Sequence, residues 1–189
     1  MILASFEYLL DYTGQPEFVS ELTDARAEFI ARTDDLFESD PSFERRMSLF
    51  LEWFILDRVG HDGLRPIDRF RNTPQAQTLS AVEHEELESL SLSRLTLMEF
   101  RSWRSGLGRF TELLPKSRIR VNCPVAPIGL TQGDIVECRL YELGGQTFVS
   151  DVMTFLPRDA KRLILKACKS QKDISERSEL LDFVHKIAF

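Results

Sequence analysis

Apolar side chains recur at helical spacing through the first 93 residues of the chain. The pattern predicts a short helix over residues 2–12 and a longer one that begins at Pro16. A third helix is expected to start at Asp40, because Asp is a favoured N-cap and Pro41 suits a first turn. These segments make the first half of the chain helical.

The third helix, which follows Pro41, is apolar almost all round and includes Trp53, which we expect in the core. Such a helix is typical of the centre of a bundle. Further on, Ser80 and Glu83 form an S-x-x-E capping box. They predict a last N-terminal helix whose inward side includes Val82.

The pattern changes after residue 93, where residues of high β-propensity begin to alternate. Gly144 and Gly145 separate two such runs and predict a two-residue hairpin turn. A helix follows from Pro157, and a final one is expected over 174–187. The predicted strands are 95–103, 106–114, 118–125, 134–143 and 146–156.

The chain is therefore predicted to be an α+β protein. An N-terminal helical bundle over residues 1–93 precedes a small antiparallel β-barrel or curled sheet over 94–189, with two C-terminal helices. No flexible linker separates the two regions, so the alternative that they share one core stays open.

Charge is distributed unevenly between these regions. The net charge is −6 over 189 residues, yet residues 1–93 hold 19 acidic and 8 basic side chains. Residues 94–120 hold 7 basic and 2 acidic side chains, and residues 121–189 hold 9 of each. A basic segment in an acidic chain calls for a partner, either inside the molecule or outside it.

The stretch "RSWRSGLGRF" (101–110) lies at the centre of the basic segment. Small β-domains bind single-stranded nucleic acid through basic grooves with stacking aromatic rings, and this segment has both residue types. The candidate binding residues are Arg101, Trp103, Arg104, Arg109, Phe110, Arg118 and Arg120.

The same residues also fit an internal clamp, in which the arginines pair with acidic residues of the helical region. The clamp is the favoured interpretation, because a helical region of strong negative charge opposes the approach of a polyanion. It predicts that charge reversal at Arg104 and Arg118 lowers thermal stability.

Metal and cofactor chemistry finds little support in the sequence. Asp57 and His61 have i, i+4 spacing, but Gly60 is expected to end their helix between them. The adjacent acids Asp34 and Asp35 are typical of a solvated helix face. We expect no metal site and no cofactor.

Catalytic signatures are missing as well. Cys123, Cys138 and Cys168 show no C-x-x-C spacing, and Cys138 alternates with a predicted core face, which favours packing. No phosphate-binding loop, G-x-S-x-G or H-E-x-x-H occurs. We therefore expect no catalytic residues and no enzyme activity.

The overall composition, 43% hydrophobic and 29% charged, is that of a soluble globular protein. The N-terminus lacks a positively charged region, and no apolar run approaches the roughly 20 residues of a membrane span. The few, widely spaced cysteines favour a reducing compartment. A cytoplasmic protein with no membrane partner is expected.

Part of the chain resembles a known group of bacterial proteins. The segments "FLEWFILDRVGHDGLRPIDRF", "MEF", "TELL", "LTQGDIVECRLYELGGQTF" and "FLP" occur in this order. Over residues 43–165 the chain is similar to bacterial proteins of unknown function that often end in the short SEC-C zinc motif. That tail needs clustered cysteines, and this chain has only Cys168 there. The resemblance implies a bacterial origin and this order of elements, and it implies no activity.

Together these observations predict a non-enzymatic protein-interaction or regulatory adaptor whose partner is another protein. The alternative is a nucleic-acid-binding protein that uses the basic and aromatic strands of residues 94–120. The oligomeric state stays open.

Overall fold

The computed structural model describes residues 4–33, 39–40, 42–114 and 116–170. The chain divides into two compact units, of which the first is Met1–Ala31 with Asp35–Ser93 and the second is Arg32–Asp34 with Arg94–Phe189. Helices make up the first unit and a sheet with a helix makes up most of the second. The predicted α+β class is confirmed.

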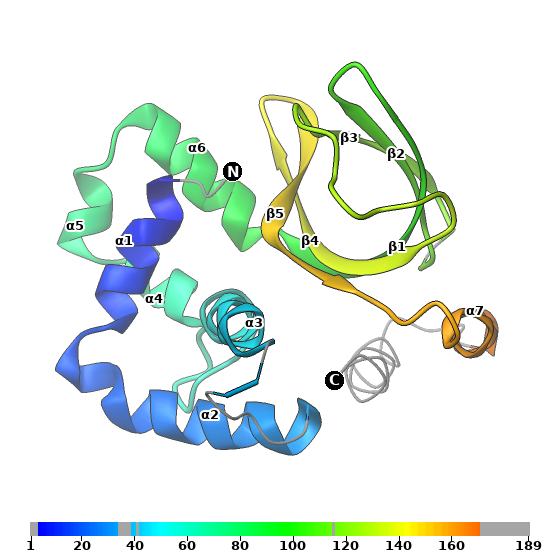
Figure 1. Cartoon of the computed structure of the whole chain (residues 1–189). Helices are drawn as coiled ribbons and strands as arrows, with labels where there is room; N and C mark the ends of the chain where they lie inside the picture. The colour runs from blue at the N-terminus through cyan, green and yellow to red at the C-terminus, as the bar shows by residue number, and fades with distance from the viewer. Residues whose placement is uncertain (1–3, 34–38, 41, 115, 171–189) are drawn as a thin grey trace. The chain divides into compact units, whose positions relative to one another are not determined.

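Four helices of the first unit, η1, α4, α5 and α6, begin at local sequence signals that favour a helix start, and Figure 1 shows the arrangement of the chain's helices. Proline occupies the first turn of η1, α4 and α5. The capping box of α6 is confirmed: the Ser80 hydroxyl accepts from the Glu83 backbone N–H, and the Glu83 carboxylate accepts from the Ser80 N–H at 2.7 Å. The elements are α1 (Ala4–Thr13), η1 (Pro16–Phe18), α2 (Val19–Thr33), α3 (Phe43–Leu56), α4 (Pro66–Arg71), α5 (Pro74–Gln77) and α6 (Ala81–Ser91).

Two local predictions in this unit are wrong. The N-cap of α3 is Ser42, and Asp40 lies outside the helix, where its carbonyl accepts from the Phe43 N–H at 2.9 Å. Val82 is 65% exposed, because in the first turn of α6 it lies off the side that carries the buried Leu87 and Leu90.

Aromatic rings and arginine–glutamate pairs hold the first unit together. Phe29 of α2 contacts Phe50 and Trp53 of α3 at centroid distances of 5.5 and 5.7 Å. Trp53, which was expected in the core, packs against these rings but is only partly buried. The Glu21 carboxylate accepts from Arg69 of α4 at 2.6 Å and from Arg58 at 3.3 Å.

A five-stranded antiparallel sheet, in the order β3-β2-β1-β4-β5, forms the described part of the second unit together with α7 (Lys161–Ser170). Its strands are β1 (Arg94–Arg104), β2 (Leu107–Glu112), β3 (Arg118–Asn122), β4 (Ile135–Leu143) and β5 (Gln146–Phe155). Gly144 and Gly145, both with positive φ, form the predicted turn between β4 and β5.

The sheet is not a closed barrel, which corrects one of the two predicted forms. Figure 1 shows it strongly curved, with β3 and β5 as its edges. The Asn122 side-chain amide donates to Gln146 Oε1 at 2.5 Å and links the two edge strands, but they are not neighbours in the backbone ladder.

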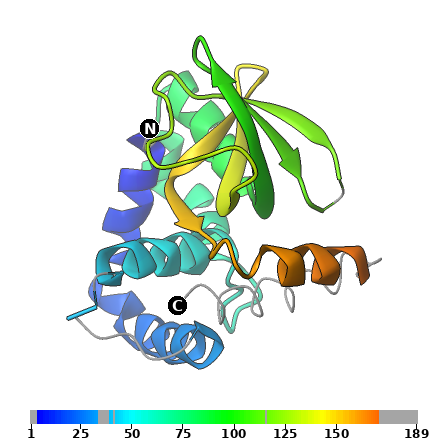
Figure 2. The same ribbon diagram turned by 45° about the vertical axis from the view of Figure 1, so that its right-hand side comes forward.

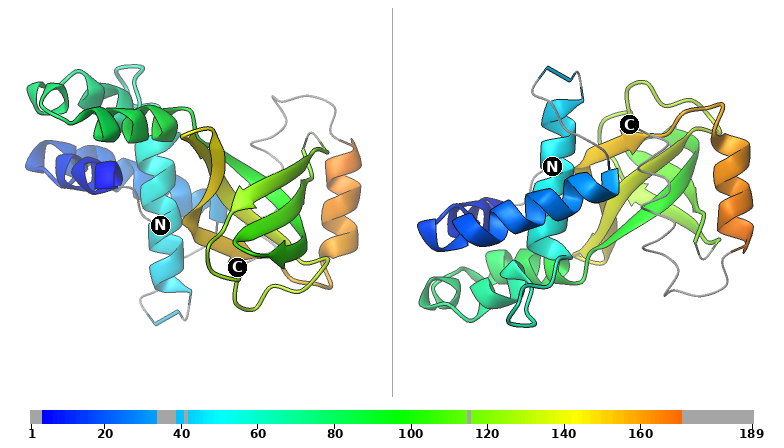
Figure 3. Two further views of the ribbon diagram at one scale, coloured as in Figure 1. Left: turned by 90° about the horizontal axis from the view of Figure 1, so that it is seen from above. Right: turned by 90° about the horizontal axis from the view of Figure 1, so that it is seen from below.

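Each face of the sheet carries its own apolar cluster. The inner face holds Phe100, Phe110, Val121 and Cys138. On the outer face, Ile164 of α7 is fully buried in a cluster with Leu97, Ile135, Leu156 and Cys168, and Figure 3 shows α7 beside the sheet in both views. α7 belongs to this cluster at one part of the outer face, and the remaining part of that face, on β1, β2 and β3, lies outside the cluster.

The first of the two predicted C-terminal helices is confirmed as α7, which follows β5 after a short connection (Figure 2). The second, over 174–187, lies outside the described residues. None of the described helices combines the length and the apolar composition that a membrane span requires.

Candidate anion-binding face

The stretch Arg101–Phe110 folds as a hairpin. β1 ends at Arg104 and β2 begins at Leu107, so Ser105 and Gly106 form a two-residue turn, with φ of 51° and 80°. Two successive positive φ values are those of a type I′ turn, whose twist suits antiparallel strands. The glycine is therefore a turn residue, and the arginines around it belong to strands.

Strand pairing brings arginines from three strands onto the outer face. Arg109 of β2 lies opposite Ser102 of β1 and opposite Arg120 of β3, and Arg118 lies opposite Thr111. Directly opposed residues have Cβ atoms about 5 Å apart and share a face. We call Arg101, Arg104, Arg109, Arg118 and Arg120 the arginine face; all five are exposed.

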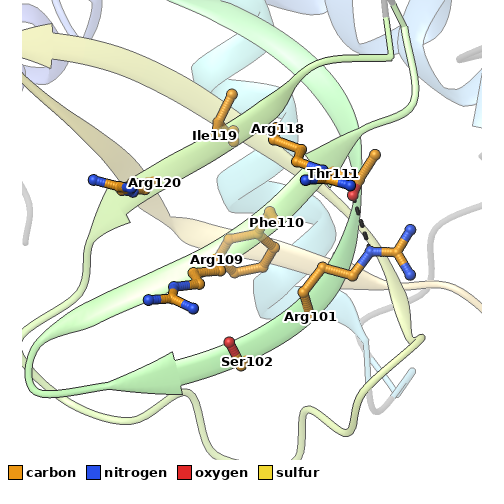
Figure 4. A pocket seen from close by; sticks show the side chains of 8 residues that line it. All are labelled: Arg101, Ser102, Arg109, Phe110, Thr111, Arg118, Ile119 and Arg120. Atoms are coloured by element: carbon orange, nitrogen blue, oxygen red, sulfur yellow. Dashed lines mark hydrogen bonds between the residues drawn. The ribbon is translucent and has the colours of Figure 1, made fainter.

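A β-bulge places Arg101 on this face. The pairing of β1 with β2 shifts between Phe100 and Ser102, so Arg101 has no cross-strand partner. An extra residue in one strand locally re-aims the side chains on either side of it. Arg101 Nε donates to Thr111 Oγ1 at 2.9 Å, as Figure 4 shows, and its Nη2 pairs with Glu99 at 2.8 Å.

The other four arginines of the face lack such partners. In the part of the chain that the structure describes, Arg104, Arg109, Arg118 and Arg120 make no ion pair and no side-chain hydrogen bond. Like charges directly opposite each other in a sheet are destabilising, and Arg109 opposes Arg120 without a carboxylate between them. An anion bound at the face would relieve this repulsion.

Three of these four arginines, Arg109, Arg118 and Arg120, line a shallow hollow of about 900 Å³ together with Arg101 (Figure 4). A smaller hollow of about 330 Å³ adjoins it and shares Arg109 and Arg120. The larger hollow is lined by Arg101, Ser102, Arg109, Phe110, Thr111, Arg118, Ile119 and Arg120.

The two predicted aromatic residues pack in the inner cluster, although Phe110 also borders the larger hollow. Phe110 is 3% exposed and packs against Phe100 at a centroid distance of 5.3 Å. Trp103 is partly buried against the same inner cluster, and its indole N–H donates to the Cys123 carbonyl at 2.8 Å. The stacking role predicted for both rings is therefore not supported by their positions.

Two hydroxyl residues of the hollow, Ser102 and Thr111, were not singled out from the sequence. Thr111 shares the alternation of Arg109 on β2, so period-2 counting could have found it. Ser102 could not be found in this way, because the bulge before it breaks the alternation of β1.

A cluster of charged residues lies at one end of the arginine face. Glu99 is buried and pairs with both Arg101 and Lys161, the first residue of α7, the latter at 2.9 Å. Beyond it, the Asp134 carboxylate accepts from Arg158 Nε at 2.7 Å and from the Thr131 N–H at 2.8 Å. These bonds, chiefly the one from Arg158, lower the pKa of Asp134 to about 2.

The three cysteines are buried or partly buried. Cys138 is fully buried in the inner cluster, which confirms its packing role. Burial raises the pKa of the Cys123 and Cys168 thiols, and a protonated thiol is a weak nucleophile. Within the described residues no three His, Cys, Asp or Glu side chains gather where they could hold a metal ion.

Comparison of the chain with protein-family models, with curated proteins and with solved structures found no match. The function of the arginine face is therefore inferred from its geometry and charge alone.

Proposed function

We propose that this protein is a non-enzymatic binding protein that holds an anionic partner on the arginine face. One observation carries the proposal: Arg109, Arg118 and Arg120 line the larger hollow without an ion pair among the described residues. Arg104, which is unpaired as well, lines the smaller hollow beside it. Guanidinium groups bind carboxylates and phosphates through two parallel hydrogen bonds, so an array of them suits an anion with several charges.

The residues that line the larger hollow favour binding over catalysis. They are arginine, serine, threonine, phenylalanine and isoleucine. Arginine stays protonated in proteins, so it supplies charge and hydrogen bonds but no proton transfer near neutral pH. General acid–base chemistry needs a group that titrates near the working pH, and this lining provides none.

The adaptor role fits the same surface. An adaptor that recruits an acidic partner needs an exposed basic face, and an otherwise acidic chain limits unspecific attraction to other anions. The internal clamp is the competing interpretation, and it makes the opposite prediction about stability.

Charge reversal separates the two interpretations. For Arg104→Glu with Arg118→Glu, the binding face predicts a melting temperature within about 2 °C of the unmodified protein, since exposed, unpaired side chains contribute little to stability. It also predicts that retention on an immobilised polyanion, heparin, is lost. The matched control is Arg162→Glu, a reversal at an exposed arginine of α7 outside the arginine face.

A clear fall in melting temperature for the double variant, with no such fall for Arg162→Glu, would support the clamp and contradict the proposal. Unchanged retention on heparin at an unchanged melting temperature would also contradict it, because the face would then not hold the anion.

A further inference from the structure

We infer that the anionic partner is a single-stranded nucleic acid, held by its phosphodiester backbone and without regard to base sequence; this rests on the proposed function. Phosphates and carboxylates both suit arginine forks, so the choice between them depends on what else the face presents.

The face lacks the exposed apolar centre that usually anchors a protein partner, so among acidic partners a nucleic acid fits it better. Protein–protein interfaces are anchored by aromatic and aliphatic side chains at their centre, within a polar rim. Of the apolar residues that line the larger hollow, Phe110 is buried in the inner cluster and Ile119 is partly buried against it. Leu107, 46% exposed, lines only the smaller hollow. The exposed Val125 and Ile128 belong to the loop after β3 and line neither hollow. The centre of the face is charged, which favours a polyanion over an acidic protein segment.

The spacing of the arginines fits a regular chain of phosphates. Arg118 and Arg120 are two residues apart on β3, which separates them by about 6.7 Å along the strand. Arg109 faces Arg120 from β2 and extends the row across the sheet. Successive phosphates of an extended single strand repeat at a comparable distance, so one backbone can meet one arginine per phosphate.

The width of the face favours one strand over a duplex. From β1 to β3 it spans two interstrand spacings, or about 10 Å. The major groove of a duplex alone is about 12 Å wide and separates two backbones. A patch of this width holds one backbone at a time.

The side chains of the arginine face also predict that binding does not depend on the base sequence. The rings that could stack on bases, Trp103 and Phe110, pack in the inner cluster, and Phe110 is only 3% exposed although it borders the larger hollow. The hydroxyls of Ser102 and Thr111 remain as phosphate donors: Thr111 Oγ1 accepts from Arg101, so its own O–H is free to donate. Binding then depends on charge and is independent of sequence.

Fluorescence anisotropy with the full chain tests this. The probes are a labelled oligothymidylate of about 20 nucleotides, a mixed-sequence strand of the same length, its duplex, and labelled polyglutamate. For four phosphate contacts on a single strand, the salt slope is about −2.8, which is a loss of about 50-fold in affinity between about 50 and 200 mM salt. The two single strands should bind within about threefold of each other, and the duplex more weakly.

The decisive variant is Arg109→Ala with Arg120→Ala, which removes two contacts and should reduce the slope by about 1.4. Arg162→Ala is the matched control and should leave the slope unchanged. Melting temperatures of both variants, measured alongside, show that each still folds.

The outcomes distinguish a failure of the nucleic-acid inference from a failure of the proposed anion-binding function. If polyglutamate binds and oligonucleotides do not, with loss in the double variant, the proposed function stands and the inference is wrong. Tighter binding of the duplex, a marked base preference, or an unchanged slope in the double variant also overturns the inference. If no polyanion binds at low salt, the inference and the proposed function both fall.

Discussion

Asp134, which immediately precedes β4, offers a direct test of the electrostatics beside the arginine face. Its carboxylate accepts four hydrogen bonds: from Arg158 Nε at 2.7 Å and Nη2 at 2.9 Å, and from the Thr131 N–H at 2.8 Å and Oγ1 at 2.9 Å. All four favour the ionised form, and the pKa falls from 3.8 to about 2. We predict that Asp134→Asn destabilises the protein near neutral pH and not in acid.

The magnitude follows from the shift in pKa. A difference of about 1.8 pKa units corresponds to at most about 2.4 kcal/mol of folding free energy. The Arg158 side chain is 69% exposed, so solvent screens its share, and about 1 kcal/mol is the expected contribution. Because the folded pKa is depressed, this stability is fully present above pH 4 or so and is lost as the pH falls through about 2.

Urea unfolding of the full chain measures the effect. In a Trp53→Phe background, fluorescence reports Trp103, which lies in the same unit as Asp134. The difference in unfolding free energy between this background and the same chain carrying Asp134→Asn should be about 1 kcal/mol at pH 6 and clearly smaller, though not yet zero, at about pH 2.5. Glu142→Gln, at an exposed carboxylate of β4, is the control. An equal difference at both pH values, or one that grows in acid, would refute the reasoning.

Two further predictions concern local signals that the structure confirms. Ser80→Ala removes the capping box of α6 and should lower the free energy of unfolding by about 1 kcal/mol, measured by urea unfolding, while Ser80→Thr keeps most of it. A full loss in the threonine variant would count against capping as the cause. Gly145 has a φ of 72°, so Gly145→Ala should lower the free energy of unfolding by about 1 kcal/mol in the same measurement. Gly144→Asn should leave the free energy of unfolding unchanged, because asparagine is accepted at this position of a type I′ turn. Equal costs at both positions would contradict this.

Local chemistry accounts for the predictions that succeeded. The five strands, the Gly144–Gly145 turn, the capping box and the helix after Pro157 all depend on neighbours in the sequence. Such signals act within a few residues, so they are readable without a fold. The start of α3 was misplaced by two residues because Asp40 and Ser42 are both good N-caps. The bundle packing of the first unit stays a prediction.

The candidate site was predictable only in part. The sequence singled out the five arginines, but it grouped Trp103 and Phe110 with them, and these rings lie on the inner face. Ser102 escaped notice because the bulge at Arg101 breaks the alternation on which face assignment depends.

By itself, the sequence determined the α+β class, the order of elements and the concentration of arginine between residues 94 and 120. Only the tertiary structure decided which side chains share a face, which arginine pairs with Glu99, and that the sheet stays open. The physical reason is that propensity and alternation are properties of neighbouring residues. Register, bulges and ion pairs join residues far apart in the chain, and they are settled when the strands meet.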